Sequence, residues 1–270
     1  KARAQEMAVK DSRIDAAKAA HDGLLEDLKR LEDQLLVGLE EQEKEVGEEG
    51  NTPEEASGEE KSGTTGKRKG MDLQLSVQIM AAMAATVDTK NVMNPGHSAR
   101  VAQYAAKIGE RLGMPEEKQR VLYAMGLAHD IGKIIIPDDI LAKPDELTKE
   151  ERDIVMRHPV IGYEILRNVT EMPGLCTGAR WHHERYDGKG YPDGLREKEI
   201  PLEARILAVA DAFDAMTSPR VYAGMKPYAE ARLDLMEHKG TQFDPDVVDA
   251  LLFVMDEEQE QQLHQQQKRA

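Results

Sequence analysis

The sequence predicts an all-α protein, and three observations support that fold class. Between Met71 and about Met255, apolar residues recur with the three- and four-residue spacing of amphipathic helices, and breaks rich in proline and glycine separate the runs. No convincing stretch alternates apolar and polar residues as a strand would. The hydrophobic content of 40% comes mainly from aliphatic residues and methionine, with only 4% aromatic residues, which favours helices.

The first segment, residues 1–38, carries a short heptad pattern. Its apolar positions alternate steps of three and four, as the seam of a coiled coil requires: Ile14, Ala17, His21, Leu24, Leu28, Leu31 and Leu35. The strongest part spans barely two heptads. Two interpretations stay open, namely a helix that forms a homodimer through residues 14–36 and connects an upstream module, or a surface helix that packs on its own domain.

The second segment, residues 39–70, has no periodicity and is predicted to be an acidic, disordered linker. Residues 39–60 contain ten glutamates and one lysine, so they hold nine of the fifteen net negative charges. The overall charge argues against a nucleic-acid backbone or an anionic membrane as the main partner. Because most of this charge lies in a solvated linker, it says little about the rest of the surface.

The remaining bulk properties predict a cytoplasmic protein. The single cysteine, Cys176, excludes an internal disulfide and suits a reducing compartment. There is no signal peptide, and no apolar run approaches the roughly 18 residues of a membrane span. Because the chain starts at Lys1 rather than at a methionine, we expect it to be a fragment of a longer protein with any sensor or anchor upstream.

The main domain, residues 71–255, is predicted to be a succession of helices. Two of them show an apolar stripe: Val101, Tyr104, Ile108 and Leu112 in one, and Ile154, His158, Ile161 and Ile165 in a second that runs over residues 151–166. The stretch 203–216 is apolar nearly all round, as a buried helix is. A polar tail, residues 256–270, follows and is expected to fray.

Several of these helices carry a titratable residue where an apolar one is expected. The set consists of His97, His129, Asp130, His158, His182, His183 and Asp211. A single buried histidine is ordinary, but five imidazoles and two carboxylates in one helical domain are costly to bury without compensation. A pair of divalent cations compensates, because imidazoles and carboxylates are their ligands and a carboxylate can bridge two ions.

Two neighbouring metal ions suit the hydrolysis of a phosphoester. One ion lowers the pKa of a bound water so that hydroxide forms near neutral pH, and both stabilise charge on the phosphoryl oxygens. Lys133, one helical turn after Asp130, would add positive charge at the same place. The alternative is that Lys133 is an ordinary exposed lysine.

Four motifs resemble a known family. "LAHDIGKIIIPD" around His129 and Asp130, "HHERYDGKGYP" at 182–192, "IPLEARILAVADAFDAMTS" and "GTQFDP" are similar to the HD-GYP branch of the HD phosphohydrolases, over residues 75–254. The resemblance implies a helical bundle that hydrolyses the bacterial second messenger cyclic di-GMP to linear pGpG or onward to GMP. It also implies two divalent metal ions, iron or manganese.

The family's site residues are carried over by motif position. The resemblance implies that one ion is held by His97, His129, Asp130 and Asp211, and the second by His158, His182 and His183, with Asp130 bridging. It implies catalytic roles for Asp130 and Lys133 and substrate contacts for Lys133, Arg220 and Tyr222. The loop Gly190-Tyr191-Pro192 would contact partner proteins such as GGDEF-type synthases, or be a well-made turn without a separate role. Glu184 is expected to support the ligands through a hydrogen bond.

Two positions depart from the family pattern. Met93 stands where some members have a glutamate that helps to hold a third metal, which favours two ions here. Ala223 stands where many members have a basic residue after the Arg-x-Tyr, unless Lys226 replaces its contact. Two alternatives to cyclic di-GMP hydrolysis therefore stay open: a catalytically weak module that binds a nucleotide or a partner, and a hydrolase of another cyclic dinucleotide such as cyclic GMP-AMP.

Overall fold

A computed structural model describes residues 63–90, 94–143, 145–170, 172–218 and 226–269 of the chain. The heptad segment 1–38, and with it the predicted dimer, lies outside the described residues, as do residues 39–62 of the predicted linker. The described elements are α2 (Gly63–Lys90), α3 (His97–Arg111), α4 (Glu116–Ala128), η1 (Ile131–Ile135), α5 (Asp138–Leu141), α6 (Lys149–Val155), α7 (His158–Leu166), α8 (Leu175–Trp181), η2 (Glu197–Glu199), α9 (Leu202–Thr217), α10 (Tyr228–Glu237) and α11 (Pro245–Arg269).

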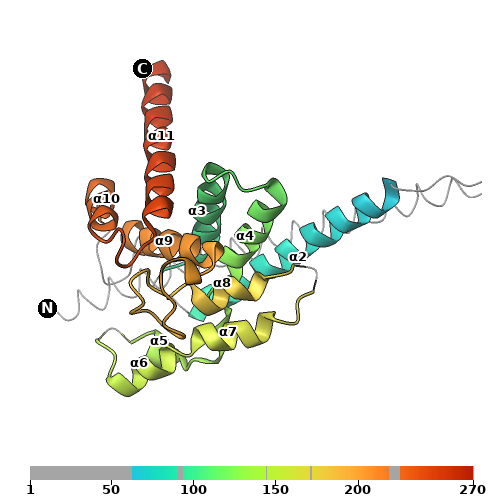
Figure 1. The fold of residues 1–270 in the computed structure, drawn as a ribbon, viewed down its shortest axis with the longest axis vertical. Coiled ribbons are helices and arrows are strands. Elements are labelled where there is room, and N and C mark those ends of the chain that lie inside the picture. Colours follow the sequence, from blue (N-terminus) through green and yellow to red (C-terminus); the bar gives the residue numbers. More distant parts are fainter. Residues whose placement is uncertain (1–62, 91–93, 144, 171, 219–225, 270) are drawn as a thin grey trace, which may run out of the picture. The chain divides into compact units, whose positions relative to one another are not determined.

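The predicted all-α fold class is confirmed (Figure 1). In the described parts of the chain there is no β-strand, and extended pairing is limited to an isolated bridge between Lys239 and Phe243. None of the described helices is both long enough and apolar enough to cross a membrane.

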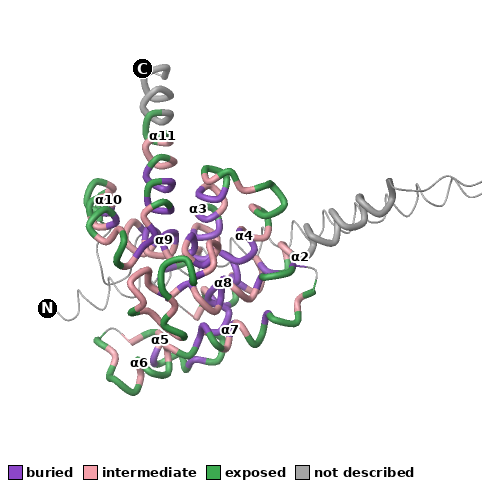
Figure 2. Tube along the Cα trace, viewed as in Figure 1, coloured by how far each residue is buried: buried purple, intermediate pink, exposed green. Residues whose placement is uncertain are grey.

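The core lies where five helices meet. α3 packs against α4 and α9, and α8 packs against α4, α7 and α9. Figure 2 shows that buried residues concentrate on these helices, whereas α6 is largely exposed. The predicted buried helix is confirmed as α9, with Ile206, Leu207, Val209 and Phe213 all at most 1% exposed. This packing brings the ends of several helices close to the middle of α9.

The predicted helix over residues 151–166 is wrong, because it is two helices. α6 ends at Val155 and α7 begins at His158, with Pro159 in the first turn, where a residue without an N–H is tolerated. The break separates the two halves of the predicted apolar stripe, and Ile154 and Ile165 are 37% and 39% exposed. His158 is buried as expected, but it is buried because it starts α7 and not because it belongs to a continuous stripe.

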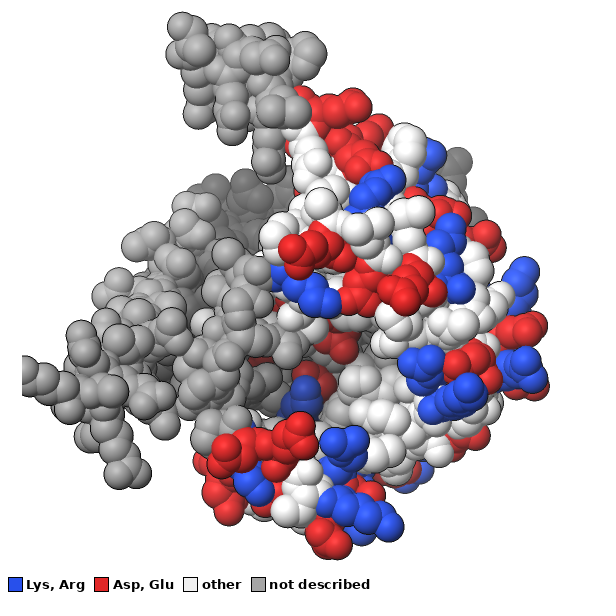
Figure 3. Space-filling view, turned by 90° about the vertical axis from the view of Figure 1, so that its left-hand side faces the viewer, with Lys and Arg blue, Asp and Glu red and all other residues white. Residues whose placement is uncertain are grey.

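The predicted domain limits stay predictions beside the bounds of the described elements. α2 begins at Gly63, within the predicted linker, and the second compact unit of the fold starts at Leu75. α11 continues to Arg269, through most of the predicted polar tail. On the face drawn in Figure 3, the described Lys and Arg side chains lie among Asp and Glu side chains, without a continuous basic surface of the kind that nucleic acids require.

Candidate metal centre

Six of the seven predicted ligand positions lie at or beside the ends of helices. His97 begins α3, His129 and Asp130 follow the last residue of α4, His158 begins α7, and His182 and His183 follow the last residue of α8. Asp211 comes from the middle of α9. The termini of the packed helices converge on this part of α9, so residues spread over more than a hundred positions meet in one place.

Four of these histidines have a hydrogen bond at one ring nitrogen. In three of them the acceptor is a backbone carbonyl oxygen. Nδ1 of His129 lies 2.7 Å from the carbonyl oxygen of Gly126, and Nδ1 of His158 lies 2.7 Å from that of Val155. Nδ1 of His182 lies 3.0 Å from the carbonyl oxygens of both Gly178 and Ala179. A carbonyl oxygen only accepts hydrogen bonds, so each Nδ1 carries the proton and Nε2 keeps a lone pair for a ligand.

His97 is held differently, because the acceptor for its Nδ1 is a carboxylate. Oδ2 of Asp214 lies 2.7 Å from Nδ1, and Oδ1 of Asp211 lies 3.2 Å from Nε2 of the same ring. His183 has no hydrogen-bonded ring nitrogen among the described residues. Its ring instead stacks on that of Tyr191, with the centroids 4.9 Å apart and the planes 24° from parallel.

The free donor atoms face one another. Nε2 of His158 lies 3.2 Å from Nε2 of His182 and 3.3 Å from Oδ1 of Asp130, while Nε2 of His129 lies 3.4 Å from Oδ2 of Asp130. Donors that share an ion at about 2.1 Å stand roughly 3.0 to 3.4 Å apart for bond angles near 90° to 109°. The spacing of the donors therefore fits ligands that share divalent ions.

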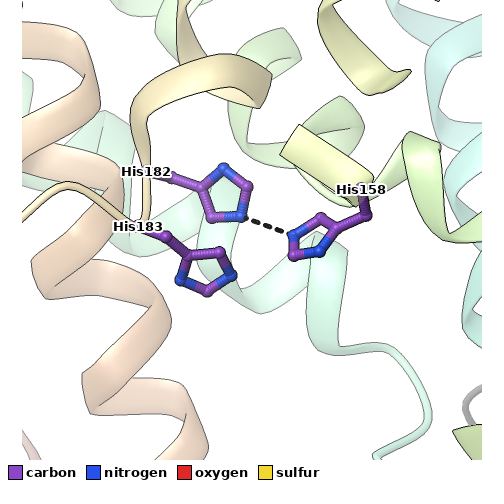
Figure 4. A group of neighbouring side chains, drawn as sticks. All are labelled: His158, His182 and His183. Atoms are coloured by element: carbon purple, nitrogen blue, oxygen red, sulfur yellow. Dashed lines mark hydrogen bonds between the residues drawn. The ribbon is translucent and has the colours of Figure 1, made fainter. Parts of the chain in front are cut away.

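The donors form overlapping groups around Asp130. His158, His182 and His183 make one group, His97, His129 and Asp211 a second, and His129, Asp130 and His182 a third, each with ligand atoms within 4.8 Å of one another. Figure 4 shows the first group, with His182 and His183 at the end of α8 facing His158 at the start of α7. The first two groups contain ligands from one implied half each, the third joins His129 and His182 through Asp130, and the division of ligands between two ions stays a prediction.

Two buried polar atoms support the fit to a metal. Nε2 of His129 and Oδ1 of Asp130 are buried, and neither has a hydrogen-bond partner among the described residues. Leaving buried polar atoms unpaired is costly, and such atoms are rare in folded proteins. A cation that accepts both lone pairs would remove this cost, so the residues present fit a divalent metal centre.

The two halves of the centre differ in the direction in which the pKa values of their histidines are shifted. Burial lowers the pKa of His158 and of His183 to about 3, so both rings are neutral near pH 7. Burial also opposes a charge on His97, but hydrogen bonds to Asp211 and Asp214 outweigh it and raise the pKa of His97 to about 10. The half with the carboxylates therefore holds protons that an ion would displace, and the half with three histidines does not.

Lys133 is not an ordinary exposed lysine, because it is paired with one of the candidate ligands. Its ammonium group lies 2.5 Å from Oδ2 of Asp130, and its side chain is 18% exposed. Burial opposes the charge, but the Asp130 carboxylate outweighs it and raises the pKa of Lys133. A fixed positive charge thus stands directly beside the central carboxylate.

The loop after the two adjacent histidines folds back onto them. The backbone N–H of Tyr191 donates to the carbonyl oxygen of His183, and a Cβ on Gly190 would meet the backbone nitrogen of Arg185 at 2.3 Å, so only glycine fits. Glu184 accepts hydrogen bonds from the backbone of Asp193 and Gly194, at 2.7 and 3.0 Å. Glu184 thus ties down the loop, and neither of these two bonds reaches a ligand histidine.

Apart from Lys133, the predicted substrate contacts are not described. Arg220, Tyr222 and Ala223 lie outside the described residues, and so does Met93. Lys226 is described, and its ammonium group is bound to the carboxylate of Asp234 on α10. Whether Lys226 replaces the contact of the basic residue that is missing at Ala223 therefore stays a prediction.

Sequence reasoning missed the surroundings of His97. Asn94 and Arg100 both donate to Asp214, and Asp88 accepts from the backbone N–H and the hydroxyl of Ser98. The sequence contains one signal for this arrangement, since Asp214 follows Asp211 by nearly one helical turn in an otherwise apolar helix. The spacing does not reveal that one aspartate faces the ligands and the other lies behind His97.

Known proteins resemble part of the chain. It is 42% identical, over 65% of its length, to a cyclic di-GMP phosphodiesterase response regulator of Xanthomonas campestris. It is 39% identical, over 60% of its length, to a 3'3'-cGAMP-specific phosphodiesterase of Vibrio cholerae. These matches cover 47% and 38% of the two relatives, so the chain spans less than half the length of either.

A solved structure and a family model complete the comparison. The fold is similar to that of an HDG"Y"P protein from Bdellovibrio bacteriovorus, with a TM-score of 0.52 and 21% identity over 70% of this chain and 64% of the other. The family model described as HD domain matches residues 82–247, which include all seven ligand positions. The chain therefore belongs to the HD domain family, as its HD-GYP motifs predicted.

Proposed function

We propose that the chain is a metal-dependent phosphodiesterase that hydrolyses cyclic di-GMP to pGpG, to GMP or to both. The observation that carries this proposal is the set of five histidines and two aspartates whose free donor atoms stand at ligand-sharing distances. The similarity to a relative named as a cyclic di-GMP phosphodiesterase supports the choice of substrate.

The proposed metal content is two divalent ions, iron or manganese. His97, His129, Asp130 and Asp211 would hold one ion, and His158, His182 and His183 the other, with Asp130 shared. When bound, the ions would lower the pKa of a coordinated water and neutralise charge on the phosphodiester. Nitrogen and oxygen donors suit first-row ions of this kind.

The residues of the chain have separate tasks in this proposal. The backbone carbonyls behind His129, His158 and His182 hold each ring with Nε2 toward the centre, so that no rotation is needed when the ligands bind. The ammonium group of Lys133 provides fixed positive charge beside Asp130, where charge grows on the phosphoryl oxygens. Arg220 and Tyr222 are proposed to bind the substrate.

A hydrolase of cyclic GMP-AMP is the second candidate. The similarity to a relative that is named as specific for 3'3'-cGAMP favours it, and so does Ala223 in place of a basic residue. The catalytic centre would be the same for both substrates. Only the residues that bind the bases would differ.

The first experiment measures turnover of both cyclic dinucleotides by protein loaded anaerobically with Fe²⁺ or Mn²⁺, with products separated by chromatography. Formation of pGpG or GMP from cyclic di-GMP, abolished in Asp130→Ala, is the expected result. Preference for cyclic GMP-AMP would support the second candidate. Absence of turnover with two bound ions would contradict the enzyme proposal and favour a module that binds a nucleotide or a partner without hydrolysis.

Location and partners are also proposed. The single cysteine, Cys176, suits a reducing compartment, and we place the activity in the cytoplasm.

The loop Gly190-Tyr191-Pro192 is proposed to bind signalling proteins such as GGDEF-type synthases. A homodimer through residues 14–36 is proposed from the heptad pattern, and an unchanged oligomeric state in a chain that lacks residues 1–40 would contradict it.

A further inference from the structure

The carboxylate of Asp214 is completely buried behind one ligand histidine. It accepts the Nδ1 hydrogen of His97 at 2.7 Å, while the other nitrogen of that ring faces Asp211 at 3.2 Å. Both aspartates come from α9, so one helix holds the His97 ring from its two nitrogens. Asp214 does not point at the other ligands, because its two oxygens are already occupied by hydrogen-bond donors.

Those donors come from three different parts of the chain. Arg100 of α3 donates from Nε to Oδ1 at 2.6 Å, and Ser218, directly after α9, donates to the same oxygen at 2.7 Å. Asn94, just before α3, donates to Oδ2 at 3.1 Å. A buried carboxylate with this many donors stays ionised and cannot rotate away from His97.

This arrangement separates His97 from the other ligands. His129, His158 and His182 each have a neutral carbonyl oxygen behind the ring, whereas His97 has the negatively charged carboxylate of Asp214 behind its ring. A carboxylate on the second nitrogen fixes the ring orientation and makes the first nitrogen a stronger donor to a metal. Metal affinity in the half that contains His97 should therefore depend on Asp214, which is not itself a ligand. Metal affinity in the half with three histidines should not.

We propose that Asp214 is a positioning residue that sets the affinity of the metal position formed by His97, His129 and Asp211, and that Arg100 and Ser218 hold it in place. This inference rests on the proposed metal centre. It predicts that loss of the Asp214 charge weakens the binding of one ion. The ion held by His158, His182 and His183 should stay bound as before.

The test is a titration of the metal-free protein with Mn²⁺, followed by electron paramagnetic resonance, which counts free Mn²⁺ and detects the coupling between two neighbouring bound ions. We expect the unaltered protein to bind two ions. Asp214→Asn should bind one ion as before and the second about 10- to 100-fold more weakly. The coupling signal should then disappear at Mn²⁺ concentrations that still fill one position.

Asp244→Asn is the matched control. Asp244 is also a buried carboxylate and is also bound to an arginine, Arg205, but it contacts none of the ligands. Its substitution should lower the melting temperature while both Mn²⁺ affinities stay unchanged. A loss of the second ion in this control as well would show that any broken buried ion pair has the effect, and would overturn the specific role of Asp214.

Two further outcomes decide the inference. If the unaltered protein binds fewer than two ions, the proposed metal centre fails, and the inference falls with it. If the unaltered protein binds two ions and Asp214→Asn binds both with unchanged affinity, only the role of Asp214 is overturned. Should Asp214→Asn not fold, Ser218→Ala removes a single donor to Asp214 and should weaken the same one ion several-fold. Unchanged binding of both ions in Ser218→Ala would then overturn the inference.

Discussion

The orientation of each candidate ligand histidine depends on what its ring contacts on the side away from the centre. Three rings have a backbone carbonyl as that partner, and His97 has Asp214. His183 lies against Tyr191 instead, which gives a residue of the Gly-Tyr-Pro motif a direct contact with a ligand. The motif is therefore in direct contact with the candidate metal centre.

Lys133 is expected to act on the reaction and not on metal binding. Lys133→Gln removes the positive charge beside Asp130 and should lower kcat by about 10²- to 10³-fold, as loss of one preorganised charge-stabilising group does. The measurement is turnover together with metal content by elemental analysis. Lys143→Gln removes an ammonium group that binds Glu151, away from the ligands, and should leave kcat unchanged. A Lys133→Gln protein that turns over normally would contradict this role.

The pKa values of the histidines predict a pH-dependent affinity for only one of the two ions. Without metal, His97 holds its proton at all pH values below about 10, so an ion must displace that proton, and affinity at this position rises with pH. His158 and His183 are neutral above about pH 4, so the other position should not depend on pH near neutrality. Calorimetric Mn²⁺ titrations between about pH 6 and 8 in buffers of different ionisation enthalpy measure the released protons. Equal pH dependence at both positions would contradict the prediction.

At the level of elements, the packing of η1 against α7 brings Lys133 and His158 to the same centre. A Cβ on Gly132 would lie 2.0 Å from the carbonyl oxygen of His158 and 2.7 Å from the backbone nitrogen of Gly162. The two backbones can approach this closely only because residue 132 has no side chain. The glycine of the "HDIGK" motif is thus required by contact with α7, and its backbone conformation is not the reason.

Gly132→Ala is therefore expected to push η1 away from α7. The free energy of unfolding should fall by about 1–3 kcal/mol or more, as for other overpacked sites. Metal content should fall as well, because Asp130 directly precedes η1 and His158 begins α7. Denaturant unfolding and elemental analysis measure the two effects. Gly113→Ala is the control, because it has open space around the added atom and should cost only about 1–2 kcal/mol for its positive φ. Gly113→Ala should also leave the metal content unchanged, so an equal loss of metal in both variants would contradict the packing argument.

At the level of the whole molecule, the candidate metal centre connects four of the packed helices and the segment after α4. Its ligands come from α3, α7, α9 and the ends of α4 and α8, so bound ions would cross-link most of the core. The native state alone has this arrangement of donors. Metal binding should therefore stabilise the fold as a whole and not just the residues at the centre.

Removal of metal by a chelator is expected to lower the melting temperature, and Mn²⁺ should restore it. An ion at 100 times its dissociation constant adds about 2.7 kcal/mol to the free energy of unfolding. Thermal unfolding with and without Mn²⁺ measures the shift. The double variant His97→Ala, His158→Ala loses a ligand from each half and should show no shift. A shift of the same size in that variant would mean that Mn²⁺ stabilises the protein elsewhere.

The sequence by itself determined the helical class, the identity of the seven candidate ligands and the family, because helical periodicity and motif spacing are local properties of the chain. Only the tertiary structure decided that these residues converge, since the convergence depends on how α3, α4, α7, α8 and α9 pack. The break between α6 and α7 escaped the periodicity, because the apolar stripe continues across residues that are exposed in the fold. The contact of Asp214 with His97 escaped it too, because a contact between residues 117 positions apart leaves no pattern in the chain.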